Sequence, residues 1–157
     1  MAHRPGIHAS FLVEHKFDLH RSKVFAGWAR PDIKERWFVG PPDWKLHERS
    51  FDFSIGGHEL NIAGPANGPL HAFEAFYHDI ITDERIVYSY TMRLGGKLQS
   101  VSIATVEFGT GARETLLRYT EDSIFFVAQD GPEMRRQGTE ALLAMLDDEL
   151  DRTTHTL

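Results

Sequence analysis

Six strand-like runs separated by glycine-rich or polar breaks occupy the middle of the sequence, between residues 44 and 121. Glycine pairs such as Gly56-Gly57 and Gly95-Gly96 separate several of them. Breaks this short leave no room for a helix between strands, so the pattern predicts an antiparallel meander. The predicted strands cover Trp44–Ile55, His58–Ala63, Leu70–Ile80, Arg85–Met92, Leu98–Phe108 and Arg113–Glu121. In the third of these runs both faces are apolar, so the sequence leaves open which face points inward.

A further strand and two short helices are predicted before the meander. Apolar residues alternate over residues 11–19, which is typical of a half-buried strand, and His15 falls in the inward register. Ser22 is the predicted N-cap of the first helix, and Pro31 lies in the first turn of the second. Gly40 and the two prolines after it end that second helix.

A long amphipathic helix is predicted from about Pro132 to Arg152. Its apolar stripe consists of Thr139, Leu142, Leu143, Leu146 and Leu150, with Arg135 one turn before them. The predicted fold class is therefore α+β: a curved antiparallel sheet of about seven strands wrapped around a long C-terminal helix. The two short helices after the first strand would close one end and leave a gap for a ligand.

Composition excludes several classes of protein. The chain has 157 residues, 41% of them hydrophobic, which favours one globular domain over residues 1–157. It contains no cysteine, which excludes disulfides, thiolate metal sites and a cysteine nucleophile. A net charge of −6 argues against nucleic acid as a partner. The longest apolar run, Ala141–Leu146, is far too short to cross a membrane, and no signal peptide is apparent, so we expect a cytoplasmic protein.

Four ordered motifs resemble one known family. VFAGW at residues 24–28 and RWFVGPP at residues 36–42 resemble its "VFxAW…RWWGPP" signature, and FDFSIGG at residues 51–57 resembles "FDFRVGG". The segment FYHDIITDERIVY at residues 76–88 is similar to "VYREI…ERIVYTW". The ending "TEQ…FxD…RxxGxxxLL" is matched by Thr120-Glu121, Phe125-Phe126, Asp130 and the RRQG segment at residues 135–138. The family is the homologue group of the heat-shock-protein ATPase activator, within the START-like or SRPBCC superfamily.

This resemblance implies a single START-like domain with a helix-grip fold and a deep, largely apolar cavity between sheet and C-terminal helix. Superfamily members bind lipids, hormones and polyketides, and a few are cyclases or hydrolases, so the fold alone does not define the activity. Three positions depart from the family pattern. His15 and Ser54 stand where arginine is common, and Thr139 stands where relatives often carry tryptophan.

The sequence offers no metal or cofactor site. Glu74 and His78 share a strand face but lie roughly 13 Å apart, since a strand rises about 3.3 Å per residue. Zinc ligands lie about 2 Å from the ion, so this pair alone cannot form a site. Gly109-Thr110-Gly111 resembles the start of a dinucleotide-binding loop, but it joins two strands and is predicted to be a hairpin turn. We therefore expect neither metal nor cofactor.

Polar side chains among apolar neighbours are the candidate site residues. Glu121 shares a strand face with Leu117 and Tyr119, and we hypothesise an ion pair between Glu121 and Arg135 near the mouth of the cavity. Such a pair could orient a ligand, accept a proton or simply fix the chain there. His15 is either a hydrogen-bonded core residue or a catalytic group. The candidate cavity residues are His15, Trp37, Trp44, Phe53, Tyr88, Tyr90, Leu117, Tyr119, Glu121, Arg135, Thr139 and Leu142.

These features favour binding of a small hydrophobic or aromatic ligand, because no acid–base–nucleophile set is apparent beside a rich aromatic lining. A cyclase- or hydrolase-type enzyme that uses Glu121, His15 or a tyrosine is the first alternative. A protein-interaction module similar to the co-chaperone is the second. A homodimer is possible, and an exposed apolar patch would support it.

Overall fold

The computed structural model describes residues 6–111, 113–127 and 131–155. Asp130, which contributes to the family resemblance, lies outside these ranges. The strands are β1 (Ile7–Phe17), β2 (Lys45–Phe51), β3 (His58–Gly64), β4 (His71–Ile81), β5 (Arg85–Leu94), β6 (Lys97–Thr110) and β7 (Thr115–Phe125). The helices are α1 (Arg21–Ala29), α2 (Pro31–Trp37) and α3 (Pro132–His155).

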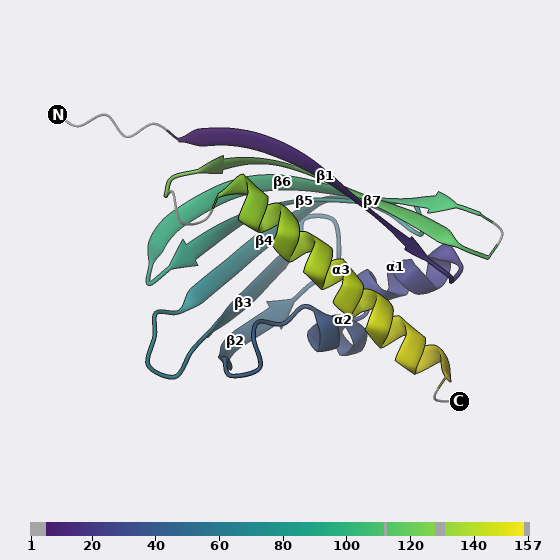
Figure 1. The fold of residues 1–157 in the computed structure, drawn as a ribbon, viewed down its shortest axis with the longest axis horizontal. Helices are drawn as coiled ribbons and strands as arrows, with labels where there is room; N and C mark the ends of the chain where they lie inside the picture. The colour runs from purple at the N-terminus through teal and green to yellow at the C-terminus, as the bar shows by residue number, and fades with distance from the viewer. Residues whose placement is uncertain (1–5, 112, 128–130, 156–157) are drawn as a thin grey trace.

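All seven strands form one antiparallel sheet in the order β1-β7-β6-β5-β4-β3-β2. The meander is consecutive from β2 to β7, and β1 joins the far edge beside β7, so that Phe17 pairs with Thr115. The sheet curves, α3 lies across its inner side, and α1 and α2 lie at one end (Figure 1). The predicted α+β helix-grip fold is confirmed.

Alternation along the strands defines the inner face of the sheet. Tyr88 and Tyr90 on β5 and Leu117 and Tyr119 on β7 are all buried, whereas the residues between them are more exposed. On the helical side, the stripe of α3 buries Leu143, Leu146 and Leu150. Apolar residues recur every second position along the strands and about every 3.6 positions along α3. The two apolar faces meet and form one core.

A β-bulge explains why residues from both alternating sets of β4 pack on the core. Tyr77 pairs with Tyr88 and Ile80 pairs with Ile86, but the register shifts by one residue between them. Because the extra residue at the bulge restores the inward direction, Tyr77 and Ile80 both pack on the core although they lie three positions apart. Phe76 points outward and is 47% exposed.

The N-terminal boundary of α1 differs from the sequence prediction. The N-cap is His20, not Ser22, and Nδ1 of His20 accepts a hydrogen bond from the Ser22 backbone N–H at 3.2 Å. The side chain of Ser22 contacts the same imidazole nitrogen at 2.9 Å. An imidazole nitrogen can therefore satisfy a free N–H of the first turn, a role that usually falls to Ser, Thr, Asp or Asn.

Close packing of α1 against α3 depends on Gly27. A Cβ at this position would lie 2.7 Å from Cδ1 of Leu146, so the side chain of Leu146 occupies the space that glycine leaves. The Gly27 carbonyl accepts a hydrogen bond from Nε1 of Trp37 at 2.8 Å, which ties α2 to α1. The two short helices therefore form one rigid end of the interior, beside α3.

None of the helices in the described part of the chain is long and apolar enough to cross a membrane.

Candidate functional site

A cavity of about 340 Å³ lies between the inner face of the sheet, the end of α2 and the first half of α3. Its volume is in the range of small-molecule sites. Most of its wall is aromatic or aliphatic. The lining residues are Trp28, Trp37, Phe38, Val39, Gly40, Asn61, Phe73, Tyr88, Tyr90, Met92, Tyr119, Met134, Arg135, Gly138, Thr139, Leu142 and Leu143.

Strand register explains why residues distant in the sequence meet in this cavity. Asn61 on β3 pairs with Phe73 on β4, and Phe73 pairs with Met92 on β5. Directly paired residues of an antiparallel sheet project from the same face, so these three form a row across the cavity floor. Stacking of Trp44 over Gly40 and the packing of Phe38 on Phe73 shape the side nearest α2.

The structure brings many of the sequence-predicted candidates together on the cavity wall. Those that line it are Trp37, Tyr88, Tyr90, Tyr119, Arg135, Thr139 and Leu142. They come from α2, from β5 and β7, and from the first three turns of α3.

The remaining candidates lie outside the lining. Nε2 of His15 contacts Oδ2 of Asp147 at 2.8 Å and ties β1 to α3 away from the cavity. Trp44 stacks on His71, and Phe53 packs on the core beside Phe25 and Tyr77. The side chains of Leu117 and Glu121 are fully buried and do not reach the cavity surface.

Sequence reasoning missed several lining residues. The sequence does not decide the direction of Phe73 because both faces of its strand are apolar, and its alternation with the buried Ala75 and Tyr77 assigns it to the inner face. Asn61 and Met92 lie within predicted strands, and pairing across β3, β4 and β5 brings them to one row. For Gly138 a useful signal was present: a glycine on the apolar side of a helix often leaves space beside it.

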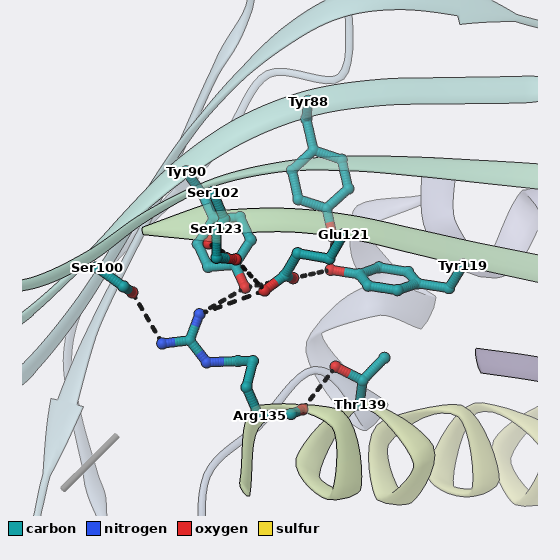
Figure 2. A network of polar contacts seen from close by, with 9 residues as sticks. All are labelled: Tyr88, Tyr90, Ser100, Ser102, Tyr119, Glu121, Ser123, Arg135 and Thr139. Carbon is teal, nitrogen blue, oxygen red and sulfur yellow. Dashed lines mark hydrogen bonds and ion pairs between the residues drawn. The ribbon is translucent and has the colours of Figure 1, made fainter. Parts of the chain in front are cut away.

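Glu121 is the centre of a buried hydrogen-bond network (Figure 2). Tyr90 and Tyr119 donate their hydroxyls to Oε1 of Glu121 at 2.6 and 2.7 Å, and the Ser123 hydroxyl donates to Oε2 at 2.8 Å. Ser102 contacts the Ser123 hydroxyl at 2.7 Å. Three donors to one carboxylate compensate for much of the cost of burying the charge.

Arg135 connects this network to α3. Its Nη1 donates to the Tyr90 hydroxyl and its Nη2 donates to the Ser100 hydroxyl, both at 2.8 Å. Nη1 also lies 3.6 Å from Oε2 of Glu121, so the hypothesised ion pair forms. The Thr139 hydroxyl donates to the backbone carbonyl of Arg135 within the helix, at 3.0 Å. Figure 2 shows that the guanidinium points from α3 toward the sheet.

The tyrosines of the network are held in their neutral form. Burial raises the pKa of Tyr88 and Tyr119 well above the ordinary value, and Tyr90 and Glu121 add to the rise in both. The hydrogen bond with Tyr119 opposes the rise at Tyr88. Burial and the Glu121 charge also raise the pKa of Tyr90, and Arg135 opposes them. The Tyr88 and Tyr119 oxygens are 3.3 Å apart. At neutral pH the cavity therefore presents hydroxyl groups that can donate or accept hydrogen bonds.

A second buried ion pair lies behind the wall on the α2 side. Nζ of Lys34, on α2, lies 2.8 Å from Oε1 of Glu59, on β3, and the Tyr77 hydroxyl donates to the same oxygen at 2.5 Å. The ammonium group also lies 4.7 Å from the ring centre of Phe38 and 4.9 Å from that of Phe51. Burial lowers the pKa of Lys34, and Glu59 opposes this shift. Nothing in the sequence patterns indicated this pair.

No group of three or more histidine or acidic side chains in the described ranges is placed to hold a metal ion.

Comparison with known proteins identifies the family. Residues 18–151 match the family described as "Activator of Hsp90 ATPase homolog 1-like protein". A solved structure from Rhizobium loti is 35% identical, with a TM-score of 0.85 over 92% of this chain and 98% of that one. Another from Rhizobium leguminosarum is 34% identical, with a TM-score of 0.89 over 96% of this chain and 99% of that one. None of the curated proteins matches the sequence.

A more distant structure supports the fold alone. The AHSA1-like protein from Aeromonas hydrophila is 16% identical, with a TM-score of 0.68 over 93% of this chain and 94% of that one. The family match covers most of the sequence and agrees with the helix-grip architecture and its interior cavity. The chain therefore belongs to the family of activator of Hsp90 ATPase homolog 1-like proteins, which has the START-like fold.

Proposed function

We propose that this protein binds a small, largely apolar molecule in the cavity between the sheet and α3. The observation that carries the proposal is the cavity itself: about 340 Å³, lined mainly by aromatic and aliphatic side chains with a few polar groups. Apolar side chains that line a concave site stay in contact with water until a ligand covers them, and their burial is favourable. A bound apolar molecule would provide that burial.

The aromatic side chains supply flat surfaces for such a ligand. Trp37, Phe73 and Tyr88 reach the cavity from α2, β4 and β5, so a ring system or alkyl chain would meet apolar surface on several sides. The hydroxyls of Tyr88 and Tyr119 can orient one polar group of the ligand. Orientation by few polar contacts is typical of sites whose affinity comes mainly from burial.

The arrangement favours binding over cyclase- or hydrolase-type chemistry. Glu121 accepts hydrogen bonds from two tyrosines of this wall, but it is fully buried and its oxygens already accept three hydrogen bonds. A general base must reach the proton that it removes, within about 3 Å. His15, the other candidate, is paired with Asp147 outside the cavity.

A neutral fluorescent probe tests the proposal. N-phenyl-1-naphthylamine fluoresces strongly in apolar surroundings, and we expect saturable binding with one site per chain. Gly138 lines the cavity, and a Cβ there would meet no atom within 4 Å, so a leucine side chain can occupy the open space. We expect Gly138→Leu to weaken probe binding about tenfold or more, which corresponds to about 1.4 kcal/mol.

Gly138→Ala is the matched control, since it changes the same backbone position without filling the cavity. Its affinity for the probe should stay within about twofold of the original. Equal affinity in the alanine and leucine variants would place the probe elsewhere. The absence of saturable binding, together with native mass spectra that show no retained small molecule, would refute the proposed function.

The proposal also covers where the protein acts, how it assembles and how many domains it has. We propose one domain over residues 1–157 that acts in the cytoplasm, with the co-chaperone-like interaction module as the alternative. Exposed apolar side chains on the outer face of the sheet, such as Leu12, Ile103 and Leu116, are compatible with a homodimer. Sedimentation velocity over a range of protein concentrations would establish the oligomeric state.

A further inference from the structure

Asn61 is a polar group on the cavity floor. It lines the cavity from β3, and within residues 6–111, 113–127 and 131–155 its side-chain amide makes no hydrogen bond. An amide that borders an apolar cavity can offer two N–H donors to a ligand. This part of the wall can therefore recognise an acceptor.

Arg49 lies beside Asn61 and also has unused hydrogen-bonding capacity. The two residues are directly paired between β2 and β3, so their side chains project from the same face of the sheet. Nη2 of Arg49 is buried and has no hydrogen-bond partner in the part of the chain that the structure describes. Nε1 of Trp28, on the wall contributed by α1, is buried without a partner in the same way. Arg49 itself does not line the cavity, so its buried guanidinium nitrogen lies behind the part of the wall that Asn61 and Trp28 form.

The charges on this side do not balance. Lys34 and Arg49 carry two positive charges, and the charge of Arg49 is close enough to contribute to the lowered pKa of Lys34. Glu59 is the carboxylate paired with Lys34, and the described residues contain no ion pair that joins Arg49 to any acid. One positive charge is left over. Arg135, the arginine that does line the cavity, is paired with Glu121.

We propose that the ligand is an amphipathic acid with a single carboxylate, which binds to the Asn61 amide and has the Arg49 guanidinium behind it as its counter-charge. The inference rests on the proposed function and specifies its ligand class. A monoanion held by the Asn61 amide would balance the one excess charge, because opposite charges attract strongly where water is largely excluded. The apolar body of the ligand would lie against Phe73, Tyr88 and Leu142. A neutral acceptor would satisfy the free donors but leave the charge of Arg49 without a counterion.

Two probes of nearly equal shape, naphthalene-2-carboxylate and naphthalene-2-carboxamide, isolate the contribution of charge. Each is titrated at pH 7 as a competitor of N-phenyl-1-naphthylamine. We expect the carboxylate to bind about tenfold more tightly than the amide. Arg49→Gln should weaken carboxylate binding about tenfold, since it removes the positive charge that attracts the carboxylate through a poorly solvated wall. It should change amide binding less than twofold, and Arg49→Lys should restore part of the preference.

Arg93→Gln is the matched control, because Arg93 is an exposed arginine on the same sheet whose Nη1 donates to the Gly96 carbonyl. Arg93→Gln should leave the preference for the carboxylate over the amide unchanged. Retained affinity for the naphthylamine probe shows that Arg49→Gln is folded. Should that variant not fold, Asn61→Leu carries the test, with an expected loss of about fivefold for the carboxylate.

The outcomes separate this inference from the proposed function. If both naphthalene probes displace the fluorophore equally, or neither displaces it, the acid specificity is overturned while the apolar site stands. A preference for the carboxylate that survives both Arg49→Gln and Asn61→Leu would also overturn it. Failure of the neutral fluorophore to bind would refute the cavity as a ligand site.

Discussion

Arg135 and Glu121 interact mainly through the hydroxyl of Tyr90, which accepts from the guanidinium at 2.8 Å and donates to the carboxylate at 2.6 Å. The closest direct approach of the two charged groups is longer, at 3.6 Å. The contact joins α3 to β5 and β7 at the edge of the cavity. We interpret it as a structural tie that also completes the wall, because its members are already occupied by one another.

Loss of the Glu121 charge should destabilise the fold strongly. Glu121→Gln replaces an acceptor of three hydrogen bonds with an amide that is itself a donor, and it removes the buried carboxylate that is paired with Arg135. We expect the free energy of unfolding to fall by about 3 kcal/mol or more. Urea titration followed by circular dichroism measures this value. Glu114→Gln, in the exposed pair with Lys16, should cost less than about 1 kcal/mol; an equal loss in both variants would contradict the prediction.

The buried pair of Lys34 and Glu59 should show strong thermodynamic coupling. Lys34→Met leaves Glu59 charged and buried, and Glu59→Gln does the same to Lys34, whose side chain is 2% exposed. Each single change should cost about 3–5 kcal/mol. The double variant should be far less unstable than the sum of the two, because it buries no unpaired charge. Additivity within about 0.5 kcal/mol in a double-mutant cycle would show that the two groups act independently.

An alanine at position 138 should stabilise the protein. Gly138 lies within α3, where glycine costs about 1 kcal/mol relative to alanine, and a Cβ there would meet no neighbouring atom within 4 Å. We expect Gly138→Ala to raise the free energy of unfolding by about 0.5–1 kcal/mol. Gly56→Ala provides the opposite case: it also has open space, but its φ of 83° is unfavourable for alanine. If both variants change stability in the same direction, backbone conformation is not the cause.

Much of the fold follows from local sequence patterns. Glycine breaks and short apolar runs predict the meander. The apolar stripe of α3 predicts that this helix covers the sheet. The predicted helix of residues 132–152 agrees with α3 at its start and is three residues short at its end. The first strand begins at Ile7, whereas the sequence predicts a start at Phe11. Its first residues are mostly exposed, and they belong to the strand because they pair with β7 and not because they are apolar.

The candidate site is predicted less completely because it depends on register and tertiary packing. The inward position of Glu121 follows from alternation along β7, but Asn61 and Arg49 become neighbours only through pairing of β2 with β3. Lys34 is on a short helix whose pattern suggests a solvated lysine, and its burial requires Glu59 from another element. Such pairs leave no periodic signal in one sequence.

All four tyrosines of the chain, Tyr77, Tyr88, Tyr90 and Tyr119, are buried and have raised pKa values, primarily because of burial. A raised pKa in the folded state means that the folded protein retains protons that the unfolded chain releases above about pH 10. The resulting stabilisation is complete below that pH and is lost as the pH rises. Above about pH 10, each tyrosine should lower the free energy of unfolding by about 1.4 kcal/mol per pH unit. The lowered pKa of Lys34 acts in the opposite direction, but only up to its ordinary value near pH 10.4.

Absorbance of tyrosinate at 295 nm should therefore appear only as the protein unfolds. We expect the alkaline titration followed at 295 nm to coincide with the loss of circular dichroism, in a single cooperative step. Tyr88→Phe removes one of the four groups and should reduce the slope of stability against pH by about 1.4 kcal/mol per unit. Ionisation of one or more tyrosines near pH 10 in protein that keeps its native circular dichroism would show that the hydroxyls facing the cavity are solvated. The cavity would then be a wet and polar space, which an apolar ligand would not favour.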